Sequence, residues 1–331
     1  MELDRTEPRR AVQMYGSIAD GAVIEDQLMT LEQYTVLEFQ KRFQTEWDCL
    51  AQLEAVRWPE GFHCPKCQCA KGYRLQTRGD IECAQCGYQA SVTAGTMFHR
   101  SHVPLRKWFW AIFLTAQDKG GISAVRLSKL LGVARATAWL MLHKIRNAMA
   151  GRNTRLILSG YIELDEGSFG RAATAKKPEK ADNQSEVIVM VESKGTNAGG
   201  IAMLVVESTS RGSIRDFVEP KVKPGQRFRT DGLQAHYVLK SMGHQLKADP
   251  IPPETAGKEL PWVHIAISLA KRFILGTYHG VSSTHLQPYL DEFCYRFNRR
   301  VGEQRLFSRL LIACVAGSPL TYGALIARQA A

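Results

Sequence analysis

The feature that most constrains this chain is a pair of Cys-x-x-Cys motifs. Cys64 and Cys67 form the first pair, Cys83 and Cys86 form the second, and fifteen residues separate the pairs. Two thiolates three positions apart occupy two corners of a tetrahedral zinc shell, and a second pair completes it. The spacing predicts a zinc ribbon with one closed, structural Zn²⁺ site. It does not decide whether the ribbon contacts nucleic acid or docks another domain.

The other features around these motifs agree with a ribbon. Gly87 follows the second pair and suits the positive φ of a knuckle turn. Short strands are expected at 73–76 and 88–92, and Cys69 is a spare thiol that complicates ligand assignment. Five of the eight cysteines fall within 23 residues, which in a reducing compartment favours metal binding over disulfides. The chain shows no secretory signal and no apolar run of about 18 residues, so a cytoplasmic location is expected.

Basic residues are concentrated in one segment. The formal net charge is +11, and residues 100–155 contain eleven Lys and Arg against one acid, Asp118. Helical patterns at 124–131 and 135–149 flank Gly132 and predict a helix-turn-helix. Its second helix would present Arg135 and Thr137 to DNA bases, and Lys144 and Arg146 to phosphates. The alternative is an ordinary helical hairpin, and the local charge favours double-stranded DNA as the partner.

The second half of the chain has a different pattern. Runs rich in β-branched residues predict strands at 161–165, 186–191, 201–206 and 227–230. A polar, Lys-containing loop is expected at 174–185, and helices at 213–218, 235–242, 263–275, 284–298 and 303–313. This order predicts an α/β fold with a mixed sheet and flanking helices. Upstream, the apolar residues from Thr35 to Val56 recur at helical spacing.

Two acids lie at predicted strand ends close to a glycine. Asp165 follows Ile162-Glu-Leu, and Asp231 follows Phe228-Arg-Thr. Two such carboxylates can hold a pair of Mg²⁺ ions that activate a nucleophile and stabilise the leaving oxygen of a phosphodiester. The alternative is that these acids are solvated turn formers.

The chain resembles bacterial insertion-sequence transposases that join an N-terminal zinc ribbon to an RNase H-like DDE domain. The resemblance extends over about residues 36–316. The matching segments are Arg57-Trp-Pro-Glu-Gly-Phe-His-Cys-Pro-Lys-Cys67, Gly95-Thr-Met-Phe, Ile162-Glu-Leu-Asp-Glu, Arg229-Thr-Asp-Gly-Leu, Lys271-Arg-Phe-Ile-Leu-Gly-Thr-Tyr-His-Gly280 and Tyr289-Leu-Asp-Glu-Phe-Cys-Tyr-Arg-Phe-Asn-Arg-Arg300.

The resemblance implies an RNase H-like catalytic core, two Mg²⁺ or Mn²⁺ ions and a homodimer or larger assembly on DNA. Asp165 and Asp231 match the first two acids of the family. The third position, often Glu, lies seven residues before a lysine, which makes it His264 before Lys271. These two positions share one helix face. His264 is thus a candidate metal ligand or a packing residue, and Lys271 is expected to grip DNA phosphate.

The roles of two glutamates are open, and so is the catalytic activity, because the third acid is absent. Glu163 and Glu166 flank Asp165 and would either assist the site or form salt bridges. The first functional hypothesis is a transposase that binds terminal inverted repeats, cleaves the phosphodiester at the element ends and joins the 3′-hydroxyl to target DNA. The rival is a non-catalytic DNA-binding protein derived from a decayed transposase. No P-loop is present, so ATP is not implied.

Five domains are expected from these patterns. They are an N-terminal extension (1–34), a helix with the zinc ribbon (35–97), the helix-turn-helix region (98–155), the RNase H-like catalytic domain (156–316) and a C-terminal tail (317–331).

Overall fold

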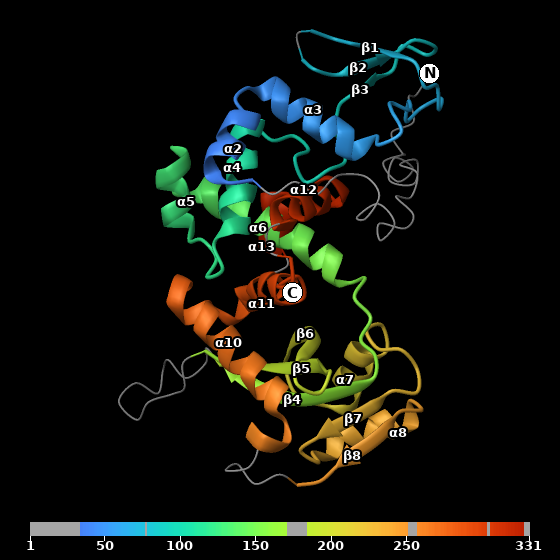
Figure 1. Cartoon of the computed structure of the whole chain (residues 1–331), viewed down its shortest axis with the longest axis vertical. Coiled ribbons are helices and arrows are strands. Elements are labelled where there is room, and N and C mark those ends of the chain that lie inside the picture. The colour runs from blue at the N-terminus through green and yellow to red at the C-terminus, as the bar shows by residue number, and fades with distance from the viewer. Residues whose placement is uncertain (1–33, 77, 171–183, 251–256, 303–304, 328–331) are drawn as a thin grey trace, which may run out of the picture. The chain divides into compact units, whose positions relative to one another are not determined.

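The computed structural model describes residues 34–76, 78–170, 184–250, 257–302 and 305–327. Contacts divide the chain into two compact units (Figure 1). The first contains residues up to 113 together with 307–319, and the second contains 114–306 and the residues from 320 onwards. Nearly all of the expected N-terminal extension, most of the Lys-containing loop and the start of the last expected catalytic-domain helix lie outside the described residues.

The first unit combines a small sheet with helices around an aromatic core. Strands β1 (Gly72–Arg74), β2 (Ile81–Cys83) and β3 (Gln89–Ala90) form an antiparallel sheet in that order. Helices α2 (Val36–Arg42) and α3 (Glu46–Arg57) precede it, and most of α4 (Leu105–Gln117) and α12 (Leu306–Ala316) belong to the same unit. The core rings belong to Phe39, Phe43, Phe109, Phe113 and Phe307.

The helical spacing from Thr35 to Val56 corresponds to two helices. Thr35 begins α2 with a capping box that includes Glu38, and Thr45 begins α3 with a second capping box that includes Asp48. A capping box satisfies free backbone N–H groups at a helix start, so the second one begins a new helix inside the apolar pattern.

The second unit is built on a five-stranded mixed sheet. Its strands are β4 (Tyr161–Phe169), β5 (Ser185–Ser193), β6 (Ala198–Val206), β7 (Arg227–Thr230) and β8 (Gln245–Ala248), in the order β6-β5-β4-β7-β8. β4 pairs antiparallel with β5 and parallel with β7, and β7 pairs parallel with β8. The mixed sheet with flanking helices confirms the predicted RNase H-like α/β class. β8 was not predicted.

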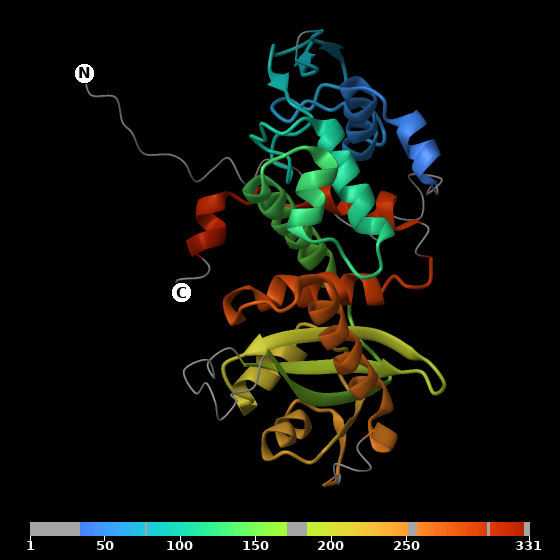
Figure 2. The ribbon, with the colours of Figure 1, turned by 90° about the vertical axis from the view of Figure 1, so that its left-hand side faces the viewer.

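Each face of this sheet has its own helical layer (Figures 1 and 2). Helices α10 (Pro261–Tyr278) and α11 (Leu286–Phe297) pack on one face, where Val189, Val263 and Leu290 share a core. Helices α7 (Arg211–Val218) and α8 (Val238–Ser241) cover the other face around Leu164 and Phe228, and the 3₁₀ helix η2 (Gln234–Tyr237) precedes α8. Both faces of the sheet are covered, and β5 reads as a nearly continuous apolar run.

The two helices of the predicted helix-turn-helix are present as α5 (Ala124–Leu131) and α6 (Arg135–Asn153). Ser123 caps the start of α5, and Gly132 ends it in the left-handed conformation at φ 57°. Both helices belong to the same compact unit as the sheet, whereas residues 307–316 group with the first unit. The contacts therefore group these segments differently from the predicted domain boundaries. The expected C-terminal tail contains helix α13 (Tyr322–Ala327).

Candidate active site and zinc site

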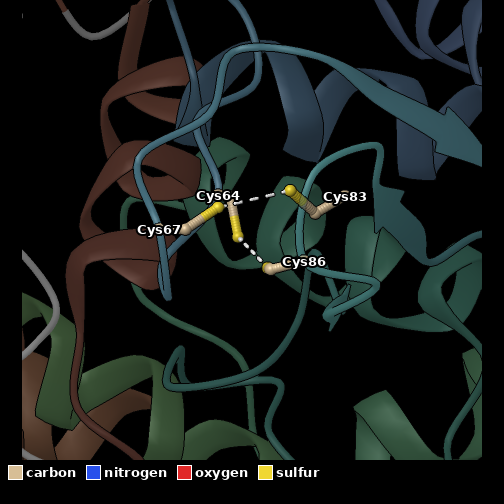
Figure 3. Close-up of side chains that lie close together, drawn as sticks. All are labelled: Cys64, Cys67, Cys83 and Cys86. Atoms are coloured by element: carbon tan, nitrogen blue, oxygen red, sulfur yellow. Dashed lines mark hydrogen bonds between the residues drawn. The ribbon is translucent and has the colours of Figure 1, made fainter.

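The four cysteines of the two Cys-x-x-Cys motifs face one another (Figure 3). The Sγ atoms of Cys64 and Cys86 are 3.6 Å apart, and those of Cys67 and Cys83 are 3.5 Å apart. All four sulfurs lie within 4.8 Å of one another. Zn–S bonds of 2.3 Å in a tetrahedron separate sulfurs by roughly 3.8 Å, so this cluster fits Zn²⁺. Gly87 has a φ of 65°, as the knuckle prediction required.

The spare cysteine lies outside that cluster. The Cys69 sulfur contacts the backbone of Lys71, at 3.4 Å from its nitrogen and 3.7 Å from its oxygen. The structure therefore resolves the ambiguity in ligand assignment that the sequence left open.

Asp165 and Asp231 occupy matching levels of neighbouring parallel strands. Glu163 of β4 pairs with Arg229 of β7, and each aspartate lies two residues further along its strand direction. Asp231 directly follows β7, as predicted. Asp165 does not end its strand, because β4 continues to Phe169 through pairing with β5. The parallel pairing with β7 stops earlier, so Asp165 lies beyond the last β4–β7 pair.

Helix α10 brings His264 to Asp165. The Nε2 atom of His264 lies 3.5 Å from Oδ2 of Asp165, and this nitrogen is buried without a hydrogen-bond partner among the described residues. Gly167 allows the helix to approach, because a Cβ at that position would lie 3.1 Å from Ile267. An orphaned imidazole nitrogen beside a carboxylate is a donor arrangement that a metal ion can use.

Glu163 fixes the start of the same helix. Its Oε2 atom accepts hydrogen bonds from the backbone N–H groups of Trp262 at 2.8 Å and Val263 at 3.0 Å. The side chain is buried, and burial raises its pKa. Glu163 therefore caps α10 and sets the level at which His264 meets Asp165. No salt bridge of Glu163 is found in the described part of the chain, so of the two predicted roles the strand-end salt bridge finds no support there.

The electric environment of Asp165 disfavours its ionised form. Burial raises the pKa of Asp165 to about 6, and the negative charges of Glu166 and Asp231 raise it as well. The hydrogen bond from the Glu166 backbone N–H to Asp165 acts in the opposite direction and lowers the pKa. The charge on Asp231 therefore acts on Asp165. An excess of negative charge in a half-buried site is the condition that a divalent cation relieves.

Lys271 lies two turns along α10 from His264. Its Nζ atom is 5.6 Å from the centre of the Phe169 ring, at the end of β4, and the residue is exposed. This position leaves the ammonium group accessible to a phosphate.

The residue that sequence reasoning missed is His236 in η2. Its ring is fully buried, with Nε2 at 2.7 Å from Oε1 of Glu166 and Nδ1 at 3.2 Å from Oδ1 of Asp231. Burial alone would lower the pKa of His236, but the two carboxylates outweigh it and raise the pKa to about 9. Donor atoms of Glu166, Asp231 and His236 lie within 4.8 Å of one another. The only sequence signal was a histidine five residues after Asp231.

The four predicted DNA contacts of helix α6 divide into two pairs. Arg135 is exposed at the first position of the helix, and Thr137, two residues later, is half-buried. Arg146 is 2% exposed, and its Nε atom donates to Glu292 at 2.8 Å. Its guanidinium also lies 3.9 Å from the centre of the Tyr289 ring.

The prediction that Arg146 contacts phosphate is therefore wrong. A guanidinium already neutralised inside the protein is not available to DNA, and this one joins α6 to α11. Lys144 is likewise buried at 9% exposure, and burial lowers its pKa, which argues against its assignment as a phosphate contact. Both residues contributed to the local charge count, which cannot distinguish buried from exposed cations.

Among the described residues, no helix is long and apolar enough to cross a membrane.

Comparisons with known proteins match both halves of the chain. The model of a transposase zinc-ribbon domain matches residues 44–89, and that of an ISXO2-like transposase domain matches residues 157–298. A protein of Halobacterium salinarum, described as an uncharacterized protein in transposable element ISH50, is 25% identical over 305 residues. The match covers 80% of this chain and 96% of that one. These matches support a transposase that combines a zinc ribbon with an ISXO2-like DDE domain, and such a domain has an RNase H-like fold.

Proposed function

We propose that this chain cleaves the phosphodiester at the ends of a mobile element and joins the freed 3′-hydroxyl to target DNA. One observation carries the proposal: Asp165 and Asp231 lie level on adjacent parallel strands, with the unpartnered His264 Nε2 3.5 Å from Asp165. These three donors come from three elements, β4, the end of β7 and α10. The reaction class is metal-assisted, in-line phosphoryl transfer.

The metal ligands in this proposal are Asp165, Asp231 and His264. When bound, Mg²⁺ or Mn²⁺ supplies the charge that activates the attacking oxygen and stabilises the leaving one. Asp165 and Asp231 hold the cations by their carboxylates, Glu163 holds α10 in position, and Lys271 binds a DNA phosphate near the site. The chain would act as a homodimer or larger assembly, because an element has two ends.

DNA recognition in the proposal rests on the N-terminal end of α6. Arg135 is the exposed base reader, and Thr137 lies two residues later in the same first turn. Lys144 and Arg146 are not part of the contact. The ribbon is held together by zinc and contributes to DNA or partner binding.

The rival proposal is a DNA-binding protein without catalytic activity. One observation favours it: a neutral imidazole occupies the place where the family often has a carboxylate, which lowers the negative charge available to hard Mg²⁺. The ribbon and the helix-turn-helix would serve both proposals equally.

A cleavage assay with matched binding measurements distinguishes the two. The wild type should nick DNA carrying the element end in the presence of Mg²⁺ or Mn²⁺. Asp165→Asn and Asp231→Asn should each bind this DNA normally and not nick it, since each removes a metal-binding charge with little change in volume. Arg135→Ala should weaken end binding by about 1–3 kcal/mol. If the wild type binds the end but never cleaves with either metal, the rival is correct.

A further inference from the structure

We infer that His236 is a positioning residue that holds Asp231 for metal binding, through a chain of contacts from Glu166 to His236 to Asp231. The inference rests on the proposed function, in which Asp231 is a metal ligand, and it extends that site to the opposite side of the sheet.

Side chains of β4 alternate between the two faces of the sheet, and this places Glu166 and His236 on the face opposite to His264. Asp165 and Glu163 lie on the face covered by α10, where they contact His264 and the start of that helix. Glu166 is the next residue, so its side chain lies on the other face, above η2. His236 therefore reaches Asp231 from the side of the sheet opposite to His264.

The buried imidazole has a carboxylate at each nitrogen. Nε2 hydrogen-bonds with Oε1 of Glu166 at 2.7 Å, and Nδ1 lies in direct contact with Oδ1 of Asp231 at 3.2 Å, outside hydrogen-bond geometry. His236 has no exposed surface, and its 2.7 Å contact with Glu166 is direct, with no ion between the two atoms. The arrangement therefore favours a supporting contact over a metal site centred on His236.

The contacts on Asp231 select one of its oxygens. Oδ1 faces the His236 ring and also accepts the backbone N–H of Leu233 at 3.1 Å. Both contacts fall on Oδ1, so Oδ2 is the oxygen that they leave for a cation. The preceding strand and the following Gly232 turn hold the backbone, since a Cβ at Gly232 would lie 3.2 Å from Asp249.

Such support is common around metal ligands. Carboxylates that bind a metal are themselves held by hydrogen bonds, and loss of this support typically costs about 10–100-fold in metal affinity or activity. Without His236, Asp231 would rotate about its own side chain, and its Oδ2 would lose the fixed direction that an octahedral metal shell needs.

Two substitutions separate the contact of His236 with Glu166 from its contact with Asp231. In His236→Asn the amide nitrogen falls near the position of Nδ1, so the contact to Asp231 is kept and the contact to Glu166 is lost. In His236→Gln the amide nitrogen falls near Nε2, so the contact to Glu166 is kept and the contact to Asp231 is lost. Both variants remove the ring, so each controls for the loss of volume in the other.

The readout is the affinity of the full chain for Mn²⁺ in the absence of DNA, measured by electron paramagnetic resonance titration. His236→Gln should weaken Mn²⁺ binding by about 10–100-fold, and His236→Asn should weaken it clearly less. The metal concentration for half-maximal cleavage should shift in the same order. A general loss of stability would affect both variants alike and would not produce this order.

Two results would overturn the inference. One is equal Mn²⁺ binding by the wild type and His236→Gln, and the other is weaker binding by His236→Asn than by His236→Gln. Asp165→Asn separates this failure from failure of the proposed function. If Asp165→Asn binds Mn²⁺ as the wild type does, the metal site itself is misplaced. If Asp165→Asn loses Mn²⁺ and His236→Gln does not, only the positioning role fails.

Discussion

The zinc cluster and the proposed catalytic cluster differ in how they are built. The zinc cluster takes four identical thiolates from two tight turns, and its sulfurs surround one centre. The carboxylate cluster takes Asp165 from β4, Asp231 from the end of β7 and His264 from α10. The first has four ligands, enough to close a tetrahedral shell. The second has three, which leaves positions for water and a phosphodiester. Closed shells stabilise a fold, and open shells can hold a substrate.

The largest expected effect is on the closed cluster. Replacing both Cys83 and Cys86 with Ser should remove the zinc and unfold the ribbon, because metal binding to such sites contributes about 10–16 kcal/mol at pH 7. Elemental analysis should find one zinc per chain in the wild type and none in the variant. Cys69→Ser is the matched control and should keep its zinc. Zinc retained by the double variant would show that the ligands lie elsewhere.

A third cluster, in which the protein neutralises its own charges, sharpens the comparison. Arg146 and Arg296 both donate to Glu292, which is 1% exposed. Glu292→Gln should lower the free energy of unfolding by about 3–5 kcal/mol, because it leaves buried guanidinium groups without their counter-charge. Added Mn²⁺ should not change this loss. Arg272→Gln, at an exposed position of α10, is the control and should change stability by about 0.5 kcal/mol or less. A loss of stability no larger than that of Arg272→Gln would mean that the ion pairs of Glu292 do not stabilise the fold.

In the carboxylate cluster, ionisation of Asp165 without bound metal should instead lower the stability of the folded protein. Burial raises the pKa of Asp165 from 3.8 to about 6, so the folded state holds this proton more tightly than the unfolded chain. The resulting stabilisation is fully present below pH 3.8 and is lost as the pH rises through about 6. Asp165→Asn cannot show this loss. Without added divalent metal, the free energy of unfolding of the wild type relative to Asp165→Asn should fall by about 1–3 kcal/mol between pH 4 and pH 7.

Calorimetry on both proteins across that range measures the difference. A constant difference between the wild type and Asp165→Asn would mean that the Asp165 carboxyl titrates at its ordinary value, and the site would then lack the excess negative charge argued above.

The two clusters also differ in how far the sequence could predict them. The zinc ligands are near neighbours along the chain, so their spacing alone specified the site. Asp165 and Asp231 lie level only through the parallel pairing of β4 with β7, and His264 reaches Asp165 only through the packing of α10; spacing encodes neither. The predicted strand ends indicated the two aspartates, whereas His264 was proposed only from resemblance to a family.

The misassigned and missed residues have the same physical cause. Arg146 was assigned to DNA from the local excess of basic residues. Its partner Glu292 lies 146 residues away in the sequence, so no local pattern indicates the buried ion pair. His236 was missed because its partners Glu166 and Asp231 reach it across the sheet edge. β8 was missed because its four residues, Gln245–Ala248, alternate between exposed and half-buried and include one strongly apolar side chain. Strands with β-branched runs, such as β5, were predictable from their own residues.

The central claim is that the open cluster is a metal-dependent catalytic site that includes His264. Cleavage of end-bearing DNA should be compared in Mg²⁺ and in Mn²⁺ for the wild type, His264→Ala and His264→Glu. Imidazole is a poorer ligand than carboxylate for Mg²⁺ and a better one for softer ions. The wild type should therefore cleave better with Mn²⁺, His264→Glu should keep or raise cleavage with Mg²⁺, and His264→Ala should lose cleavage while remaining folded. Normal cleavage by His264→Ala in both metals would contradict the claim.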